Sequence, residues 1–302
     1  MRLVTRSDFD GLICGFLLRE IGLIDNWVFV HPKDLQDGLF EANADDVLCN
    51  VPYVKGCGLW FDHHSSEIER EHIDYTGDSR LAPSCARVVY EYYGGAERFP
   101  TRAEMISFAD RIDSGHLTRE EILDPSGWVL LGFLTDPRTG LGRFRDFTIS
   151  NYQLMNMLLL DYYAADVEAV LAVPDIIERI DMYNEQIQLF VDMVQSHTTT
   201  NGNIIITDLR NVDTIYTGNR FMIYSMYPKQ NISLWIIDGR QKQNAVISCG
   251  HSILNRTSKT NVGSLMLEHN GGGHPQVGTC QIPYEDADRI IAEIVDRILK
   301  DG

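Results

Sequence analysis

The first half of the chain alternates short apolar runs with longer segments whose apolar residues recur at helical spacing. Each run is nearly continuously apolar and ends at polar residues. Runs of this kind are typical of parallel strands with helices on both faces, so the pattern predicts an α/β fold with a doubly wound parallel sheet. The predicted strands are residues 2–5, 27–31, 46–50 and 59–61, and the predicted helices are residues 12–21, 34–40, 83–93 and 101–113.

The second half of the chain predicts a separate, smaller α/β domain. Short helices are expected between residues 125 and 172, followed by one long helix over 175–195 and a polar loop over 196–202. Further strands are predicted at 203–208, 232–237, 245–250 and 279–282, with helices at 262–267 and 284–299. We therefore expect a first domain over 1–174, a linker helix and loop over 175–200, and a second domain over 201–302. Residues 65–78 are polar and are predicted to be a loop.

Polar side chains that suit a metal ion follow three of the predicted strands. Asp8 and Asp10 come after the first strand, Asn50 ends the third, and Asp62-His63-His64 ends the fourth. The carboxyl ends of parallel strands lie at one edge of a sheet, where open α/β proteins bind ligands. Carboxylate and imidazole are both acceptable to a borderline ion such as Mn²⁺ or Zn²⁺. The sequence therefore predicts a metal site at this edge.

Each of these motifs also has a plainer structural explanation. Ser7 or Asp8 can cap the helix that follows, and Asp62-His63-His64 can be a surface cluster at a strand end. We favour the metal site because a cap needs one such residue and not two acids, and because several separate elements reach the same edge.

A further acid is predicted within the helix over 101–113. Asp110 follows the apolar residues Ile106, Phe108 and Ala109, which suggests a buried position. A buried carboxylate needs a cation or several hydrogen-bond donors. Asp110 therefore either ligates the metal or pairs with Arg111.

Two glycine-rich segments lead to different interpretations. Thr139-Gly140-Leu141-Gly142-Arg143, in a segment that also contains Arg138 and Arg145, resembles a phosphate-binding turn only weakly, and we interpret the segment as a connector. Gly271-Gly272-Gly273 precedes His274, so bare backbone N–H groups and an imidazole can approach an anion together. A loose glycine-rich loop is the alternative there. Arg256 adds a positive charge in a region that is otherwise poor in charge.

Composition limits the possible partners. The 302 residues, 44% of them hydrophobic, can bury a sizeable core, and no apolar stretch is long enough to span a membrane. The N-terminus shows no signal segment, so we expect a cytoplasmic protein with no membrane partner. A net charge of −17 repels long polyanions and argues against tight binding of duplex nucleic acid. The six cysteines contain no Cys-x-x-Cys pair, which favours reduced core thiols over disulfides or a thiolate metal site.

With Asp8-Phe9-Asp10-Gly11, Asp62-His63-His64, Ala109-Asp110 and Gly271-Gly272-Gly273-His274 in this order, the chain resembles the DHH/DHHA1 phosphoesterase superfamily. This superfamily includes RecJ-like exonucleases, oligoribonuclease/pAp phosphatases, cyclic-dinucleotide phosphodiesterases and exopolyphosphatase-like proteins. The resemblance covers nearly the whole chain. It implies a DHH domain that holds one or two Mn²⁺ ions, with Mg²⁺, Co²⁺ or Zn²⁺ as alternatives, and a DHHA1-like domain that presents the substrate.

The resemblance also implies roles for individual residues. Asp62, His63 and His64 match the catalytic motif that gives the family its name. The implied metal ligands are Asp8, Asp10, Asn50, His63 and Asp110. The implied substrate-binding residues are His64, Arg256, Gly272, Gly273 and His274.

Two departures from the family pattern affect the metal site. Asn50 stands where the family has a bridging aspartate, and the histidine that often precedes the first acids is absent. A neutral amide bridges two cations poorly. The site made by Asp10, His63 and Asp110 is intact, whereas a second site is not. The protein then uses a single ion, recruits His31 or His116, or has lost catalysis.

The leading interpretation is metal-assisted hydrolysis of a phosphate ester or anhydride in a small or short substrate. The candidate substrates are a short oligonucleotide, pAp, a cyclic dinucleotide and polyphosphate, and the sequence does not choose among them. Closure of the second domain over the first is expected to exclude water. A non-catalytic sensor of phosphorylated ligands is the main alternative, and a purely structural metal is a weaker one. A homodimer is a further expectation.

Overall fold

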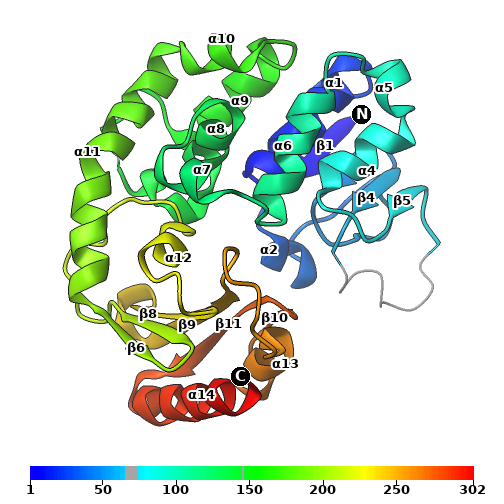
Figure 1. Cartoon of the computed structure of the whole chain (residues 1–302). Coiled ribbons are helices and arrows are strands. Elements are labelled where there is room, and N and C mark those ends of the chain that lie inside the picture. The colour runs from blue at the N-terminus through cyan, green and yellow to red at the C-terminus, as the bar shows by residue number, and fades with distance from the viewer. Residues whose placement is uncertain (65–73, 145) are drawn as a thin grey trace. The chain divides into compact units, whose positions relative to one another are not determined.

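The structure is a computed structural model that describes residues 1–64, 74–144 and 146–302 (Figure 1). The chain divides into two compact units, one made of residues 1–117 and 125–183, the other of residues 118–124 and 184–302. Both contain helices and a sheet, so the predicted α/β fold is confirmed. Most of the predicted loop 65–78 and Arg145 lie outside the described residues.

The first unit is built around a parallel five-stranded sheet with the order β2-β1-β3-β4-β5. Its strands are β1 (Arg2–Thr5), β2 (Asn26–Phe29), β3 (Asp46–Cys49), β4 (Leu59–Asp62) and β5 (Gly77–Ser79). β1 lies between β2 and β3, which makes the β1/β3 border the switch point of the sheet. Doubly wound proteins bind their ligands outside the strand carboxyl ends at such a border.

Both faces of this sheet are covered, which explains why its central strands are mainly apolar. On one face, α1 (Phe9–Glu20) packs so closely on Leu3 that a Cβ at Gly15 would lie 3.1 Å from the Leu3 side chain. The helices α4 (Cys85–Tyr92) and α6 (Ala103–Asp113) contact α1 and each other (Figure 1). On the other face, Val4 packs with Leu35 of α2 (Pro32–Gln36).

The remainder of the first unit is helical. Its further elements are α5 (Gly95–Arg98), α8 (Gly127–Thr135), the 3₁₀ turns η1 (Pro137–Thr139) and η2 (Leu141–Arg143), α9 (Asn151–Asp161) and α10 (Val167–Leu171). Ser150 and Gln153 form a capping box at the start of α9, as that pair of residue types favours. The long helix α11 (Pro174–Ser196) belongs to both units, because the division falls at Tyr183.

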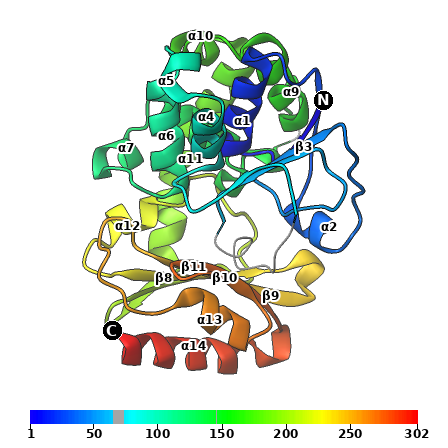
Figure 2. The ribbon, with the colours of Figure 1, turned by 90° about the vertical axis from the view of Figure 1, so that its right-hand side faces the viewer.

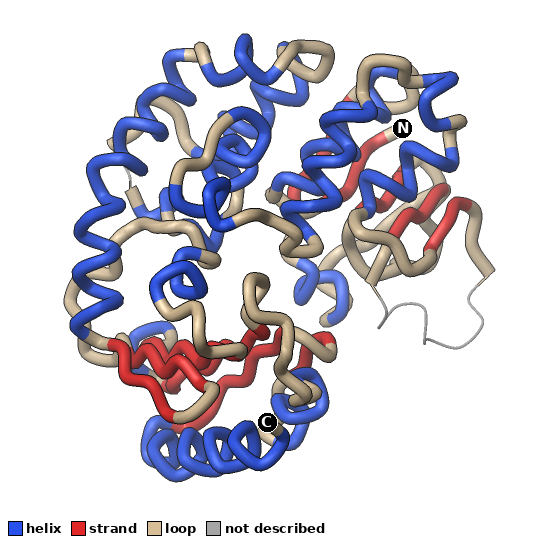
Figure 3. Tube along the Cα trace, viewed as in Figure 1, coloured by secondary structure: helices blue, strands red, loops and turns tan. Residues whose placement is uncertain are grey.

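The second unit contains a mixed six-stranded sheet with the order β10-β11-β9-β8-β7-β6 (Figure 3). Its strands are β6 (Thr198–Asn201), β7 (Ile204–Asp208), β8 (Ile232–Asp238), β9 (Asn244–His251), β10 (Gly272–His274) and β11 (Val277–Pro283). Its helical elements are α7 (Arg119–Leu123), α12 (Met222–Met226), η3 (Arg240–Lys242), α13 (Val262–Glu268), η4 (Tyr284–Asp286) and α14 (Ala287–Asp301).

Alternate residues of these strands and one side of two helices form the core of the second unit. Leu234 and Ile247 face α13 and α14, which lie on one side of the sheet (Figure 2). Ile290, Ile294 and Ile298 are spaced four residues apart on α14 and are all buried, which is the apolar stripe of an amphipathic helix.

The structure departs from the sequence-based expectation in the short polar strands and in the domain boundary. β5 (Gly77–Ser79) and β6 (Thr198–Asn201) fall in segments that were predicted as loops, since neither carries an apolar run. The units divide inside α11, and residues 118–124 belong to the second unit, where Asn219 Nδ2 donates to the Ile122 carbonyl at 3.0 Å. Among the described residues, no helix has the length and apolar character needed to cross a membrane.

Candidate functional site

The carboxyl edge of the parallel sheet brings together side chains that are distant in sequence. Asp8 and Asp10 follow β1, Asn50 follows β3, and Asp62 ends β4. Asn50 Nδ2 donates to Asp8 Oδ1 at 3.1 Å, so the ends of β1 and β3 meet as the strand order requires. The edge predicted from the sequence is therefore a real junction of polar groups.

At this edge Asp10, His63 and Asp113 form a compact group. Their nearest nitrogen and oxygen atoms lie within 4.8 Å of one another, a separation that suits a shared metal ion. His63 Nε2 is 3.7 Å from Asp10 Oδ2 and 3.4 Å from Asp113 Oδ2. The side chain of Asp10 is buried, that of His63 is 10% exposed and that of Asp113 is 30% exposed, so the group is accessible at Asp113.

The hydrogen bonds of His63 direct a lone pair toward the two carboxylates. Nδ1 lies 3.1 Å from the carbonyl oxygen of Ala82, which can only accept, so Nδ1 carries the proton. When the ring is neutral, its lone pair is therefore on Nε2, which is buried and has no hydrogen-bond partner among the described residues. That lone pair faces two acids, an arrangement that is stabilised by a cation between them or by a second proton on the ring.

Asp10 is oriented by the start of a neighbouring helix. The backbone N–H groups of Cys85 and Ala86, at the N-terminus of α4, donate to its two carboxylate oxygens at 2.9 and 2.8 Å. Burial raises the pKa of Asp10 to about 7, with the charge of Asp113 adding to the rise and His63 opposing it. A divalent cation beside these groups would offset the cost of burying the carboxylate charge. The donor set of two carboxylates and one imidazole fits such an ion.

The assignment of Asp110 as the ligand from α6 needs correction. Asp110 Oδ1 accepts from the Ser84 hydroxyl at 2.7 Å, and its Oδ2 accepts from Arg87 Nη2 at 2.6 Å. The charge of Asp110 is therefore offset within the chain, and the partner is Arg87 of α4 rather than the expected Arg111. Asp113, three residues later on the same helix, lies in the group with Asp10 and His63 instead.

Asp8 and Asn50, the remaining predicted ligands, serve the fold at this edge. Asp8 is the N-cap of α1, and its Oδ1 accepts from the Gly11 backbone N–H at 3.0 Å as well as from Asn50. Its other oxygen lies 3.2 Å from Arg6 Nε. Asn50 has a left-handed backbone (φ 57°), which asparagine tolerates better than most residues. The capping explanation therefore holds for Asp8, whose oxygens already have partners.

The histidines considered as replacement ligands have other partners. His31 caps α2 through Nδ1, which accepts from the Lys33 backbone N–H at 3.2 Å. His116 Nδ1 lies 2.7 Å from the Ser114 hydroxyl. The structure places neither in the group with Asp10 and Asp113.

Asp62 and His64 form a hydrogen-bonded pair beside the group of Asp10, His63 and Asp113. His64 Nδ1 donates to Asp62 Oδ1 at 2.8 Å, and Asp62 is fully buried. Burial lowers the pKa of His64, but the hydrogen bond and charge of Asp62, with the charge of Asp113, outweigh it and raise that pKa above its ordinary value. His64 therefore carries a positive charge more readily than an isolated imidazole.

Arg138 is a charged residue in the segment that the sequence interpretation left as a connector. Its backbone N–H and its Nε both donate to Asp136 Oδ1, at 2.8 and 2.7 Å. Desolvation lowers the pKa of Arg138, but the charges of Asp136, Asp8 and Asp113 outweigh it and raise that pKa. The Arg138 side chain is 47% exposed, so its guanidinium is accessible to an anion. In the sequence, a role for Arg138 is indicated only by the neighbouring arginines Arg143 and Arg145.

The glycine-rich segment of the second unit forms a hairpin at the edge of its sheet. Gly272 pairs with Thr279 and His274 with Val277, so β10 is the outermost strand. Gly273 (φ 156°) has no room for a side chain, because a Cβ would lie 2.2 Å from the Val277 carbonyl oxygen. A Cβ at Gly272 would meet nothing within 4 Å. Gly272 therefore exposes its backbone to whatever approaches the edge.

The turn of this hairpin is held by backbone hydrogen bonds. The N–H groups of His251 and Val262 donate to the carbonyls of Gln276 and Pro275, at 2.8 and 2.9 Å. His274 is half-buried and Arg256 is exposed, with Arg256 Nε donating to the Ile253 carbonyl at 3.2 Å.

Comparison with solved structures shows high similarity to a relative over the full length of both chains. The chain is similar to the pGpG-specific phosphodiesterase PggH from Vibrio cholerae, with 47% identity, a TM-score of 0.83, and coverage of 100% of this chain and 99% of that one. An exopolyphosphatase-related protein from Bacteroides fragilis is 13% identical, with a TM-score of 0.52 and coverage of 98% and 91%. RecJ from Thermus thermophilus in complex with Mn²⁺ is 10% identical, with a TM-score of 0.56 and coverage of 100% and 52%. The latter two show the shared fold alone. No protein-family model and no curated protein matches the chain.

Proposed function

This chain belongs to the DHH phosphoesterase superfamily, and we propose that it is a metal-dependent phosphodiesterase that hydrolyses a short linear dinucleotide. The first candidate substrate is pGpG. Attack of water on its internal phosphodiester would release the 3′ oxygen with a proton, so that GMP is the only nucleotide product. The observation that carries this proposal is the 47% identity to a pGpG-specific phosphodiesterase over the full length of both chains.

The chemical character of the chain supports a short substrate. A net charge of −17 raises the electrostatic cost of holding a long polyanion, whereas two or three phosphates need only a few positive groups. This balance favours a dinucleotide over a long nucleic acid strand.

Asp10, His63 and Asp113 would hold the divalent cation. Such an ion lowers the pKa of a bound water and neutralises charge on the phosphoryl oxygens. RecJ structures of this fold contain Mg²⁺ or Mn²⁺, which supports Mn²⁺ as the first ion to test. One ion is proposed, because the oxygens of Asp8 are already used by Gly11, Asn50 and Arg6.

His64 and Arg138 would bind the reacting phosphate from the protein side. Asp62 fixes the His64 ring and favours its protonated form, so that His64 can donate a proton to a phosphoryl or leaving oxygen. Asp136 holds Arg138 through two hydrogen bonds, which reduces the entropy lost when the guanidinium binds an anion.

In the second unit, the β10 edge with His274 and Arg256 is proposed to bind the terminal phosphate or base. Gly272 and Gly273 offer a matched pair of variants. Gly272→Ala adds a methyl group in open space and should fold normally, so a raised KM would show that substrate approaches this backbone. Gly273→Ala should instead lower Tm, because its Cβ would clash with the Val277 carbonyl oxygen.

The decisive experiment is a hydrolysis assay on metal-stripped protein. We expect Mn²⁺ to restore cleavage of pGpG to GMP, measured by chromatography, with slower cleavage of pAp, a cyclic dinucleotide or polyphosphate. His63→Ala should remove turnover while Tm stays close to that of the unaltered protein. Binding of pGpG without turnover under any divalent ion would overturn the proposal and favour a sensor.

We also propose a cytoplasmic location, which the six free cysteines support. The homodimer remains a prediction that sedimentation analysis would test.

A further inference from the structure

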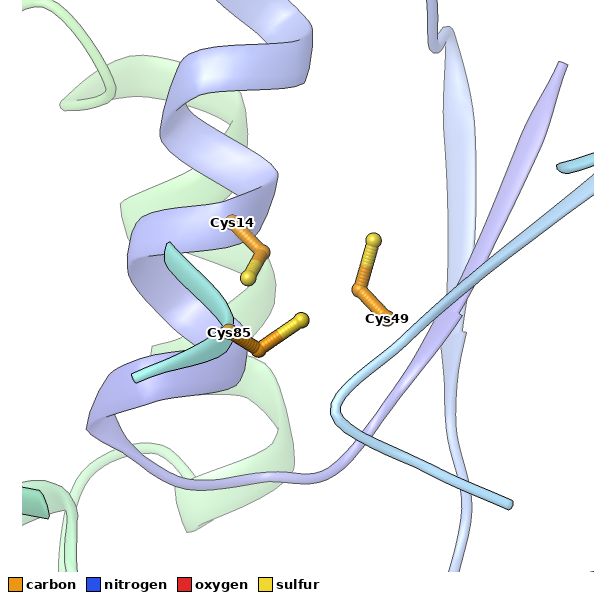
Figure 4. A group of neighbouring side chains, drawn as sticks. All are labelled: Cys14, Cys49 and Cys85. Atoms are coloured by element: carbon orange, nitrogen blue, oxygen red, sulfur yellow. The ribbon is translucent and has the colours of Figure 1, made fainter. Parts of the chain in front are cut away.

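Three cysteine side chains meet in the interior of the first unit. Cys14 lies on α1, Cys49 is the last residue of β3, and Cys85 is the first residue of α4. Their sulfur atoms point toward one another (Figure 4) and all lie within 4.8 Å of each other. All three residues are fully buried. The cluster is thus a preformed set of three sulfur donors from three separate elements.

Burial keeps this cluster neutral in the unmodified protein, because it raises the pKa of each of the three thiols. The Cys85 thiol donates to the carbonyl oxygen of Phe61 at 3.2 Å, and each of the three thiols also interacts with the other two. All three cysteines are free. As predicted from the sequence, these are reduced core thiols, and their simplest use is as small apolar residues. Their arrangement, however, matches one class of ligand.

The charge that a bound ion brings into the core indicates which class of ligand the three thiols can hold. Burying net charge in an apolar interior is costly, so the number of protons that leave the cluster should equal the charge of the ion that enters. A trivalent ion replaces three protons and uses all three sulfurs. A monovalent ion would leave two thiols protonated, and structural zinc sites use four ligands.

We propose that Cys14, Cys49 and Cys85 form a binding site for a trivalent thiophilic element, with arsenic(III) as the representative ligand. In the binding step, arsenous acid forms one As–S bond to each sulfur, the three thiol protons join its three hydroxyl groups, and three waters leave. No electron is transferred, and the product carries no net charge.

This site adjoins the candidate metal centre. The Cys85 backbone N–H donates to Asp10 Oδ2, and the Asn50 backbone N–H donates to Cys85 Sγ at 3.2 Å. Cys14 lies one helical turn beyond Asp10 on α1. Drawing the three sulfurs onto one atom would therefore displace groups that position Asp10. Binding should be slow, because the cluster opens only when the core fluctuates, and it should inhibit hydrolysis. The inhibition rests on the proposed function, whereas the binding does not.

The test uses the full-length protein with arsenite under anaerobic, reducing conditions. Intact-mass measurement should show one arsenic per chain, with three fewer thiols available to a thiol reagent. Cys14→Ser, Cys49→Ser and Cys85→Ser should each lose this adduct, and Cys57→Ser, a half-buried cysteine outside the cluster, should keep it. Cys14→Ala replaces Cys14→Ser if the serine variant has a lowered Tm.

The outcomes of the arsenite test separate the two proposals. Adduct formation that all three cluster variants retain, or no adduct with the unaltered protein, would overturn the arsenic site. An adduct in a protein that hydrolyses no substrate would support the site while contradicting the proposed function. Slow, complete loss of hydrolysis that matches adduct formation, and is absent in Cys14→Ser, would support both.

Discussion

The two edges of the parallel sheet use acidic residues in opposite ways. At the amino edge, Asp46 of β3 lies opposite Arg2 of β1, and its two oxygens accept from Arg2 Nε and Nη2 at 2.7 and 2.8 Å. The backbone N–H of Asn43 adds a further bond to Asp46. At the carboxyl edge, Asp10 and Asp113 face the unpaired Nε2 of His63. The first acid is neutralised within the chain, whereas the second pair is not.

This difference shows how to separate structural acids from functional ones at a sheet edge. An acid whose charge is offset by a guanidinium contributes to stability, as Asp46 does with Arg2, Asp110 with Arg87 and Asp8 with Arg6. Asp10 and Asp113 face the His63 ring instead, and a bound cation can compensate their charge. By this criterion Asp110 and Asp8 belong with Asp46, although both carry the sequence pattern of metal ligands.

The largest expected effect comes from the two acids of α6. Asp113→Asn should lower kcat by about 10²- to 10³-fold, because removing a metal ligand costs several kcal/mol of transition-state stabilisation. Asp110→Asn is the matched control on the same helix and should keep kcat within a few-fold while lowering Tm. The measurements are steady-state hydrolysis of pGpG and Mn²⁺ affinity by calorimetry. If both variants lose activity equally, the assignment of Asp113 as the ligand and Asp110 as a structural acid is wrong.

Asn50→Asp should replace an amide that is hydrogen-bonded to Asp8 with a carboxylate that cannot donate to it. The amide that donates to Asp8 becomes a second carboxylate, so the free energy of unfolding in a chelator should fall by about 2–3 kcal/mol. Mn²⁺ should restore much of that loss, since a second ion can then bind between the acids. Urea unfolding with and without Mn²⁺ measures both quantities. If Mn²⁺ does not change the free energy of unfolding of Asn50→Asp, no ion binds between Asp8 and residue 50.

Asp46→Asn tests the amino edge and should affect stability alone, by about 2 kcal/mol at neutral pH. Burial raises the pKa of Asp46, but the hydrogen bonds from Arg2 and Asn43 and the charge of Arg2 outweigh it, so that pKa is lowered. A lowered folded-state pKa gives stability that is present above the unfolded value of about 3.9 and is lost as pH falls through the folded value. The difference between variant and unaltered protein should therefore shrink toward acid pH. A difference that stays constant below pH 4, or a lower kcat, would contradict a purely structural role.

Much of the fold and part of the site follow from local sequence signals. β1 matches its predicted bounds, and α13 and α11 match within one residue, because apolar runs and helical periodicity are properties of neighbouring residues. The convergence of Asp10 and His63 follows from the rule that parallel strands end at one edge. The edge strands β5 and β6 lack an apolar run, and their extended conformation depends on pairing with β4 and β7.

What the sequence determined by itself is the set of groups at the sheet edge: the acids after β1, the histidines after β4 and an acid on α6. Only the tertiary structure decided which of them remain available. Asp110 and Asp113 are three residues apart on one helix and are therefore neighbours on its surface, but Arg87 and Ser84 of α4 occupy Asp110 and leave Asp113 beside His63. The meeting of Cys14, Cys49 and Cys85 was decided in the same way, because contacts between elements depend on how helices pack on the sheet and not on the residues adjacent in sequence.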